Sequence, residues 1–394
     1  NRMNIYTVAK ATQGLANYLK EHFRAPSVAI GFDSRINSEL FSKVAARVFA
    51  ANGVKVHIWP ELMPVPTVSF AVRELGCSAG VMVTASHNPS KYNGYMDFGT
   101  AWNDGRIGHI PEAVYTAFVE NVKAQSVLYG DKTTHDVAIV YSPLNGAGRK
   151  PVLRTLKELG YTNITVVKEQ EEPDGRFPTC PYPNPEIREA MELGLRYAKE
   201  KNADLLLATD PDCDRVGIAV KNAQGDYVLL SGNEVGLLLL DYLCAQKQKH
   251  GKMPKDPVLV KTIVTVDLAE RIAEHYGVET RNVLTGFKYI GEQIGLLEKS
   301  GEERRYLFGF EESYGYLTGT YVRDKDGVDG AVMICEMFSF YAALGIRLTD
   351  QLAKLYERYG YCRNTLHSYQ FEGSAGFARM QGIMAAFRQG ISTF

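Results

Sequence analysis

Short apolar runs alternate with longer amphipathic segments along most of the chain. The apolar runs predict buried strands at residues 27–32, 55–59, 80–83, 137–141, 163–167, 258–262 and 305–309, with one more in the ADLLLATD run that ends at Asp210. The amphipathic segments predict helices at residues 5–20, 37–52, 150–159, 186–202 and 267–276. A strand, a crossover helix and a further strand are typical of a mostly parallel sheet covered on both faces. The pattern therefore predicts an α/β fold.

This alternation starts afresh at Val137 and again at Pro257. A chain of 394 residues is also too long for a single hydrophobic core. We therefore expect three successive domains of mixed, mostly parallel βα repeats around a central cleft. Their predicted bounds are residues 1–130, 131–246 and 247–364. Each repeat ends near a stretch of candidate chemistry, so we expect one loop from each domain at the cleft.

Several turn-rich stretches interrupt the repeats. Met63–Pro66 predicts a proline-rich turn, and the four prolines between Phe177 and Pro185 predict a rigid extended linker. The run from Asn145 to Gly148 lacks both the Lys-Ser/Thr ending of a P-loop and the dinucleotide fingerprint. We therefore interpret it as the structural start of a helix, with phosphate binding as the alternative.

The first stretch with candidate chemistry is Thr84–Pro89, which reads TASHNP. It follows an apolar run, and the small and polar residues predict a loop that presents Ser86 at the carboxyl end of a strand. Adjacent residues rarely act together as nucleophile and base, so Ser86 and His87 alone favour a plain surface loop over a catalytic site.

The second stretch is Asp210–Arg215, which reads DPDCDR. Three carboxylates at alternate positions of an extended loop are expected to point to one side, where a hard cation would offset their charge. Asp210, Asp212 and Asp214 therefore predict a Mg²⁺ site with open positions for phosphate oxygens, such as those of a phosphorylated Ser86. The alternatives are a solvated acidic turn and a calcium loop, although the glycine and distal glutamate of an EF-hand are missing.

The charge and cysteine content of the chain argue against several classes of partner and location. The formal net charge is -1 with both signs evenly mixed, which argues against nucleic acid and anionic membranes as partners. The six cysteines show no paired spacing, so we expect free thiols and a cytoplasmic location. The longest apolar run, 235–244, is much shorter than the roughly 20 residues of a membrane span.

With these motifs together, the chain resembles the α-D-phosphohexomutase superfamily, in particular its phosphoglucomutase and phosphopentomutase branch. Members of that family carry a phosphoserine in T-A-S-H-N-P and magnesium on a D-x-D-x-D loop, as in the two stretches above. Their sugar-binding loop G-E-x-S is similar to Gly309–Gly315, where Phe310 replaces the usual glycine before Glu311. Their aspartate-arginine turn after the first strand is similar to Gly31–Arg35.

The resemblance implies a role for each candidate residue. Ser86 would carry the phosphate and contribute to the metal site with the three aspartates, and a lysine made less basic by burial would remove the proton of the attacking sugar hydroxyl. The candidates for that base are Lys288, in TGFKYIG, and Lys325, in RDKDG. The remaining predicted site residues are Arg35 and His87 near the reacting serine, and Lys91, Arg215, Glu311, Ser313 and Arg323 for substrate binding. The alternatives are ion pairs for the arginines, surface positions for the lysines and a polar turn for the glutamate and serine.

The resemblance also implies a fourth, smaller α+β domain with an R-x-S-G-T-E-P loop for the substrate phosphate. That loop is absent from the sequence, so we expect residues 365–394 to be only the start of a truncated or missing fourth domain.

The function implied is that of a phosphoglucomutase, an isomerase that moves phosphate within glucose phosphates, with Mg²⁺ as cofactor and glucose 1,6-bisphosphate as activator. The alternatives are a phosphopentomutase, a phosphomannomutase, a sugar phosphate binding module without activity, and a phosphatase with an aspartyl nucleophile. We expect sugar phosphates as the only partners, without nucleic acid or membrane, and a monomer or homodimer.

Overall fold

A computed structural model describes residues 3–90, 92, 107–362, 364–365, 369, 371 and 373–390. The chain divides into two compact units, Asn1–Tyr361 and Cys362–Phe394. The second unit contains helix α13 (Gly373–Arg388), and its described residues form no fourth domain.

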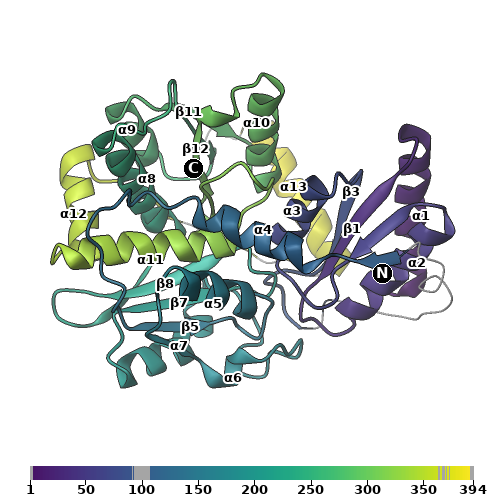
Figure 1. The fold of residues 1–394 in the computed structure, drawn as a ribbon, viewed down its shortest axis with the longest axis horizontal. Coiled ribbons are helices and arrows are strands. Elements are labelled where there is room, and N and C mark those ends of the chain that lie inside the picture. Colours follow the sequence, from purple (N-terminus) through teal and green to yellow (C-terminus); the bar gives the residue numbers. More distant parts are fainter. Residues whose placement is uncertain are drawn as a thin grey trace. The chain divides into compact units, whose positions relative to one another are not determined.

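The first unit contains three sheets, each with helices packed on it (Figure 1). The first sheet has the order β3-β1-β2-β4, and all of its pairs are parallel. It comprises β1 (Ser27–Phe32), β2 (Lys55–Ile58), β3 (Ala79–Val83) and β4 (Ile107–His109), accompanied by α1 (Ile5–His22), α2 (Ser38–Ala51), α3 (Val65–Glu74) and α4 (Glu112–Lys123).

The second sheet has the order β6-β5-β7-β8-β9 and is parallel from β6 to β7 and antiparallel from β7 to β9. It comprises β5 (Ile139–Ser142), β6 (Ile164–Val166), β7 (Leu205–Thr209), β8 (Val216–Lys221) and β9 (Tyr227–Leu230), with helices α5 (Arg149–Glu158), α6 (Lys168–Glu171) and α7 (Arg188–Glu200).

The third sheet has the order β11-β10-β12-β13, in which only β13 is antiparallel to its neighbour. It comprises β10 (Val258–Thr262), β11 (Glu279–Val283), β12 (Tyr306–Glu311) and β13 (Gly315–Leu317). The helices of this part are α8 (Gly232–Lys249), α9 (Leu268–His275), α10 (Phe287–Lys299), α11 (Gly327–Ala343) and α12 (Leu348–Tyr359). The expected class of three mostly parallel α/β domains is thus confirmed, whereas the predicted domain bounds remain predictions.

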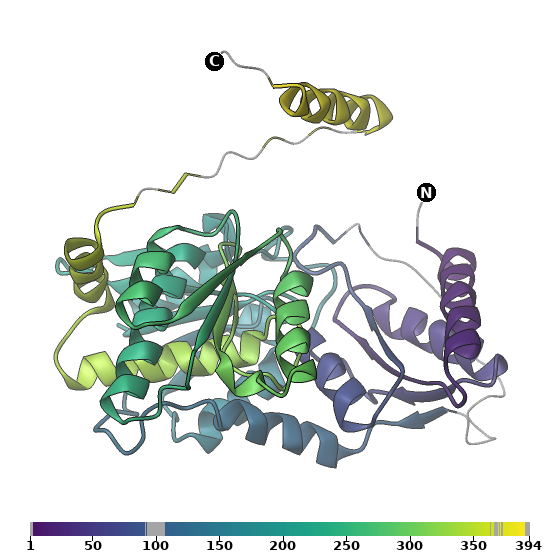
Figure 2. The same cartoon turned by 90° about the horizontal axis from the view of Figure 1, so that it is seen from above.

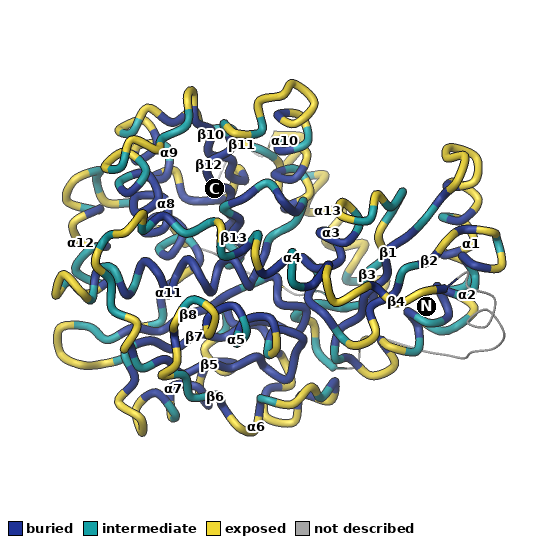
Figure 3. The backbone as a smooth tube through the Cα atoms, viewed as in Figure 1, coloured by how far each residue is buried: buried dark blue, intermediate teal, exposed yellow. Residues whose placement is uncertain are grey.

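Helix α11 forms the buried centre of the first unit. It packs against α5 and β8 on one side and against α8 and β13 on the other, so it runs between the second and third sheets (Figures 1 and 2). Nearly every residue of its first three turns is buried, as the dark tube in Figure 3 shows. Asp326 caps its start by accepting hydrogen bonds from the amides of Val328 and Asp329, which fixes the residues just before the helix.

Within the described residues, no single helix is long and apolar enough to cross a membrane. Only α11 and α12 taken together, with a bend of 90° between them, have the length and composition of a broken span.

Two turn predictions are wrong. Helix α3 begins at Val65, inside the predicted proline-rich turn, because a proline is tolerated in the first turn of a helix, where the backbone amides lack helical partners anyway. The segment from Phe177 to Pro185 is not an extended linker but folds in successive turns, and the ring of Phe177 is fully buried.

Candidate active site

The Ser86 loop follows β3 directly, at the carboxyl end of the strand as expected. Ser86 is half-buried and lies in a turn, with a positive φ of 49°. Its hydroxyl donates to Oδ2 of Asp210 at 3.1 Å, and Nδ1 of His87 lies 3.1 Å from the Ser86 hydroxyl oxygen. Burial and the charge of Arg215 lower the pKa of His87 to about 4, so this imidazole is neutral at pH 7.

Arg35 holds this loop through its backbone. The guanidinium donates to the carbonyls of Ser86, Asn88 and Pro89, and it lies over the ring of Phe177 at 5.1 Å from the centroid. The side chain of Arg35 therefore bonds to the loop backbone, and its predicted role at the reacting phosphate remains a prediction.

Thr84 connects the Ser86 loop both to Asp33, after β1, and to Asp212 of the second part, and we did not predict a role for Thr84 or Asp33. The hydroxyl of Thr84 donates to Asp33 at 2.7 Å, lies 3.1 Å from Oδ2 of Asp212, and accepts from the amide of Ser86 at 2.7 Å. Burial raises the pKa of Asp33, whose carboxylate also accepts from Ser38. Thr84 lies within the TASHNP stretch, so its position beside Ser86 was the available signal.

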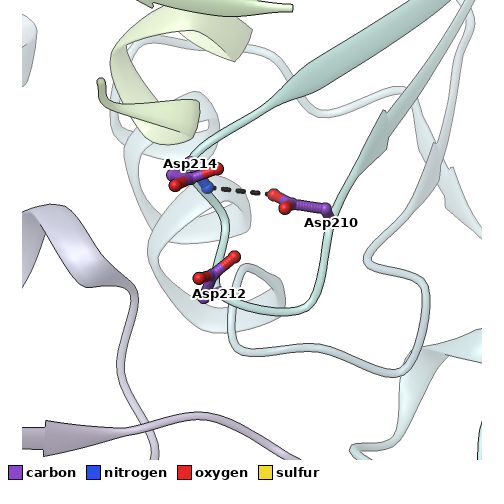
Figure 4. Close-up of side chains that lie close together, drawn as sticks. All are labelled: Asp210, Asp212 and Asp214. Carbon is purple, nitrogen blue, oxygen red and sulfur yellow. Dashed lines mark hydrogen bonds between the residues drawn. The ribbon is translucent and has the colours of Figure 1, made fainter. Parts of the chain in front are cut away.

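The three aspartates of the second stretch converge at the carboxyl end of β7, as Figure 4 shows. One oxygen from each of Asp210, Asp212 and Asp214 lies within 4.8 Å of the others, and all three residues are buried. The expected extended loop is wrong. The amide of Cys213 donates to the carbonyl of Asp210, and Cys213 adopts a φ of 53°, so a tight turn brings the carboxylates together.

Backbone donors from three parts of the chain hold this turn. Val65 at the start of α3 donates to the carbonyl of Asp212, Ala147 to that of Pro211, and Gly327 at the start of α11 to that of Cys213, at 2.7 to 3.0 Å. A Cβ on Gly146 would lie 2.4 Å from Cα of Pro211, so only glycine permits this approach. The structure thus agrees with a structural role for Asn145–Gly148.

The carboxylates have the character of a cation site. Oδ1 of Asp212 is buried and accepts no hydrogen bond, which is costly for an ionised group unless a cation binds it. Burial and the neighbouring charge of Asp214 raise the pKa of Asp210 to about 6, and burial together with both neighbours raises that of Asp212. Three hard oxygen donors fit Mg²⁺.

Lys325 joins this cluster to the predicted sugar loop. Its Nζ lies 2.9 Å from Oδ2 of Asp214 and 3.8 Å from Oε1 of Glu311, the last residue of β12. Burial by itself would lower the pKa of Lys325, but the carboxylates of Asp214, Asp324 and Glu311 outweigh it and raise that pKa. Burial of Lys325 thus comes with three carboxylates, and its role as the base remains a prediction.

The rival lysine is not brought into the cluster. Lys288 is the second residue of α10 and is exposed, with its ammonium 4.9 Å from the centroid of the Tyr289 ring. The first residue of this helix, Phe287, is the one that approaches Lys325, whose Nζ lies 5.9 Å from the centroid of the Phe287 ring.

The other predicted substrate-binding residues differ in their distance from the centre. Arg215 pairs with Glu186 and lies 3.8 Å from Asp214, and the hydroxyl of Ser313 bonds to the carboxylate of Glu311. Arg323 lies elsewhere. It pairs with Glu298 and donates to nearby carbonyls. Lys91 lies outside the described residues. Nothing in the sequence pointed to Glu186 as a partner of Arg215.

Comparison with known proteins decides the family. The models named phosphoglucomutase/phosphomannomutase, alpha/beta/alpha domains I, II and III, match residues 1–122, 115–225 and 231–359 in succession. A phosphoglucomutase from Staphylococcus saprophyticus is 35% identical over 98% of this chain and 75% of its own length. The chain belongs to the phosphoglucomutase/phosphomannomutase family. It is therefore a member of the α-D-phosphohexomutase superfamily and an isomerase of the phosphotransferase type, as the resemblance implied.

Relatives within this family differ in substrate. A "probable phosphomannomutase" from Haemophilus influenzae is 36% identical over 91% of this chain and 76% of its own length. Among solved structures, a phosphoglucomutase/phosphomannomutase family protein from Burkholderia thailandensis shares the fold with a TM-score of 0.69 at 18% identity, covering 90% of this chain and 76% of its own. An N-acetylphosphoglucosamine mutase from Aspergillus fumigatus in complex with glucose 1,6-bisphosphate has a TM-score of 0.54 at 15% identity, covering 83% and 60%.

Proposed function

We propose that the chain interconverts glucose 1-phosphate and glucose 6-phosphate through a phosphoserine at position 86 and a glucose 1,6-bisphosphate intermediate. The observation that supports this best is the Ser86 hydroxyl 3.1 Å from Asp210, within a cluster of three buried carboxylates beside Lys325. Phosphoryl transfer needs in-line positioning and compensation of charge, and these groups are suited to both once a cation is bound.

In this proposal each of these side chains has a separate role in phosphoryl transfer. Phospho-Ser86 gives its phosphate to a sugar hydroxyl, and the proton of that hydroxyl passes to the Ser86 oxygen as the bond between this oxygen and phosphorus breaks. The bisphosphate then returns its other phosphate to the Ser86 oxygen, and the Ser86 proton passes to the sugar oxygen that is released. Neutral His87 orients that oxygen, and the ammonium of Lys325 offsets charge on the transferring group. Glu311 and Ser313 bind sugar hydroxyls. Mg²⁺ held by Asp210, Asp212 and Asp214 would supply positive charge for the phosphate oxygens.

Several facts bear on the substrate. The phosphoglucomutase relatives support glucose phosphates as the substrate of this chain, and the Haemophilus relative supports mannose phosphates as a second candidate. We propose glucose 1,6-bisphosphate as activator because the Aspergillus relative was solved in complex with it. A phosphopentomutase is the third candidate.

The test is mass spectrometry of the peptide that contains Ser86, before and after incubation with glucose 1-phosphate and Mg²⁺. We expect one phosphate on this peptide, its transfer to sugar, and loss of turnover in Ser86→Ala with glucose phosphate binding retained. Full activity of Ser86→Ala would refute the proposal. Turnover of glucose, mannose and ribose 1-phosphates by the same sample then separates the three candidate substrates.

A further inference from the structure

Glu312 lies between the two proposed sugar-binding residues and contacts a different part of the third sheet. It directly follows Glu311, the last residue of β12, in the turn that leads to β13. Its Oε2 lies 3.2 Å from the hydroxyl of Thr262 and 3.3 Å from that of Thr265. These two hydroxyls lie 2.7 Å apart, and both threonines are buried.

This contact joins two loops that leave the same edge of the sheet. Strands β10 and β12 are parallel neighbours, with Lys261 opposite Phe310. Residues 262–266 and 311–315 therefore emerge side by side at the carboxyl ends, where ligands bind in such sheets. Among the described residues, the hydrogen bonds that the Glu312 carboxylate accepts link the side chains of these two loops.

Both loops also rest on the first turn of α8. A Cβ on Gly232 would lie 2.2 Å from the carbonyl oxygen of Glu312, and the side chain of Asn233 accepts from the amide of Val266 at 3.1 Å. A serine-glutamate capping box fixes the start of this helix. Packing of the Glu312 backbone against Gly232 thus fixes how closely the 311–315 loop approaches α8, and the Glu312 carboxylate holds this loop beside residues 262–266.

We propose that Glu312 is a positioning residue for sugar recognition, holding the 311–315 loop against Thr262 and Thr265 so that Glu311 and Ser313 face the hexose. The proposal rests on the proposed function for its effect on substrate, but not for the structural tie itself. Without the tie, the loop would have to be ordered on binding, which weakens sugar recognition while the phosphoserine machinery stays intact.

The experiment compares Glu312→Ala, Glu312→Gln and Thr265→Val with the matched control Glu274→Ala, which removes an exposed glutamate on α9. For Glu312→Ala we expect KM for glucose 1-phosphate to rise roughly tenfold with a smaller change in kcat, since slight misplacement of binding groups costs up to about 10²-fold. Glu312→Gln keeps one acceptor oxygen and should lie between the wild type and Glu312→Ala. Phosphate occupancy of Ser86 should match the wild type in all variants.

Hydrogen–deuterium exchange without substrate gives a second readout that does not need activity. We expect faster exchange in residues 311–315 and 262–266 of Glu312→Ala and Thr265→Val, and unchanged exchange in Glu274→Ala. Unchanged exchange in both loops would overturn the proposal whatever the enzyme does. If the wild type turns over no hexose phosphate but the loops still loosen, the proposed function fails and the tie stands. An active wild type with unchanged KM in Glu312→Ala overturns the positioning role.

Discussion

At the scale of single residues, one ammonium contacts both the proposed metal loop and the proposed sugar loop. The Nζ of Lys325 lies 2.9 Å from Asp214 and 3.8 Å from Glu311, whereas Lys288 is exposed. Removing one preorganised donor that stabilises charge in a transition state typically lowers kcat by about 10²–10³-fold. We therefore expect that loss in Lys325→Met.

The matched control for this prediction is Lys288→Met, which should keep kcat within about threefold of the wild type, because the altered charge is solvated. Steady-state kinetics with glucose 1-phosphate, on samples with wild-type circular dichroism, measure both variants. A large loss in Lys288→Met with a mild effect in Lys325→Met would reverse our assignment.

Sequence could not separate these two lysines. Both lie in short motifs that contain glycine, and what distinguishes the two lysines is their tertiary environment. Lys325 directly precedes the capped start of a buried helix and pairs with a carboxylate more than a hundred residues earlier in the chain. The carboxylates of Asp210, Asp212 and Asp214 were predictable because their spacing in the sequence is itself unusual. Thr84, which lies beside Asp212, and Glu186, which pairs with Arg215, were not, because contacts between residues far apart in the chain leave no local pattern.

At the scale of elements, strands that are buried on both faces were predicted closely, since continuous apolar runs such as those of β1 and β10 are typical of strands in the interior of a parallel sheet. Loop conformation was less predictable. The substitution of Phe310 for the usual glycine is accommodated by Gly236 on α8, where a Cβ would lie 2.2 Å from the Phe310 ring. This fit between a large side chain on β12 and a glycine on α8 can be recognised only from the structure, because the two residues are far apart in the sequence.

The start of α11 carries a prediction on pH. Asp329 is fully buried and accepts hydrogen bonds from the amide and hydroxyl of Thr318. Burial and the charge of Asp326 raise the pKa of Asp329 to about 8, against 3.8 ordinarily. Between these pH values the folded protein retains a proton that the unfolded chain releases. The free energy of unfolding therefore falls as pH rises, by up to about 1.4 kcal/mol per pH unit from this group.

Asp329→Asn removes this titration, so its melting temperature should fall less between pH 5 and pH 8 than that of the wild type. Asp226→Asn, an exposed site in the turn between β8 and β9, serves as the control and should follow the wild-type slope. Thermal melts across this pH range measure the difference. Parallel curves for Asp329→Asn and the wild type would show that Asp329 is ionised throughout.

At the scale of the whole first unit, the metal loop connects segments that are distant in the sequence. Its carbonyls accept from the starts of α3 and α11 and from Ala147, so the loop is held by segments that belong to all three α/β parts. Release of the loop would break all of these contacts together. Its stability should therefore be coupled to that of the unit as a whole.

If the proposed metal site binds a cation, this coupling predicts that the cation stabilises the folded unit and that its removal leaves like charges unpaired. Asp212 is buried near Asp210, Asp214 and Asp33, whose charges raise its pKa together with burial. A cation that binds only the folded state adds about 2.7 kcal/mol to the free energy of unfolding when its concentration is a hundred times its Kd.

In Asp212→Asn the repulsion between the carboxylates is relieved and a proposed ligand of the cation is lost. We therefore expect a higher melting temperature than the wild type in EDTA, a smaller increase on adding Mg²⁺, and little turnover. Calorimetry over a Mg²⁺ series tests this, with Asp226→Asn as control. If Asp212→Asn melts below the wild type in EDTA and responds equally to Mg²⁺, the carboxylates are a structural cluster and not a cation site.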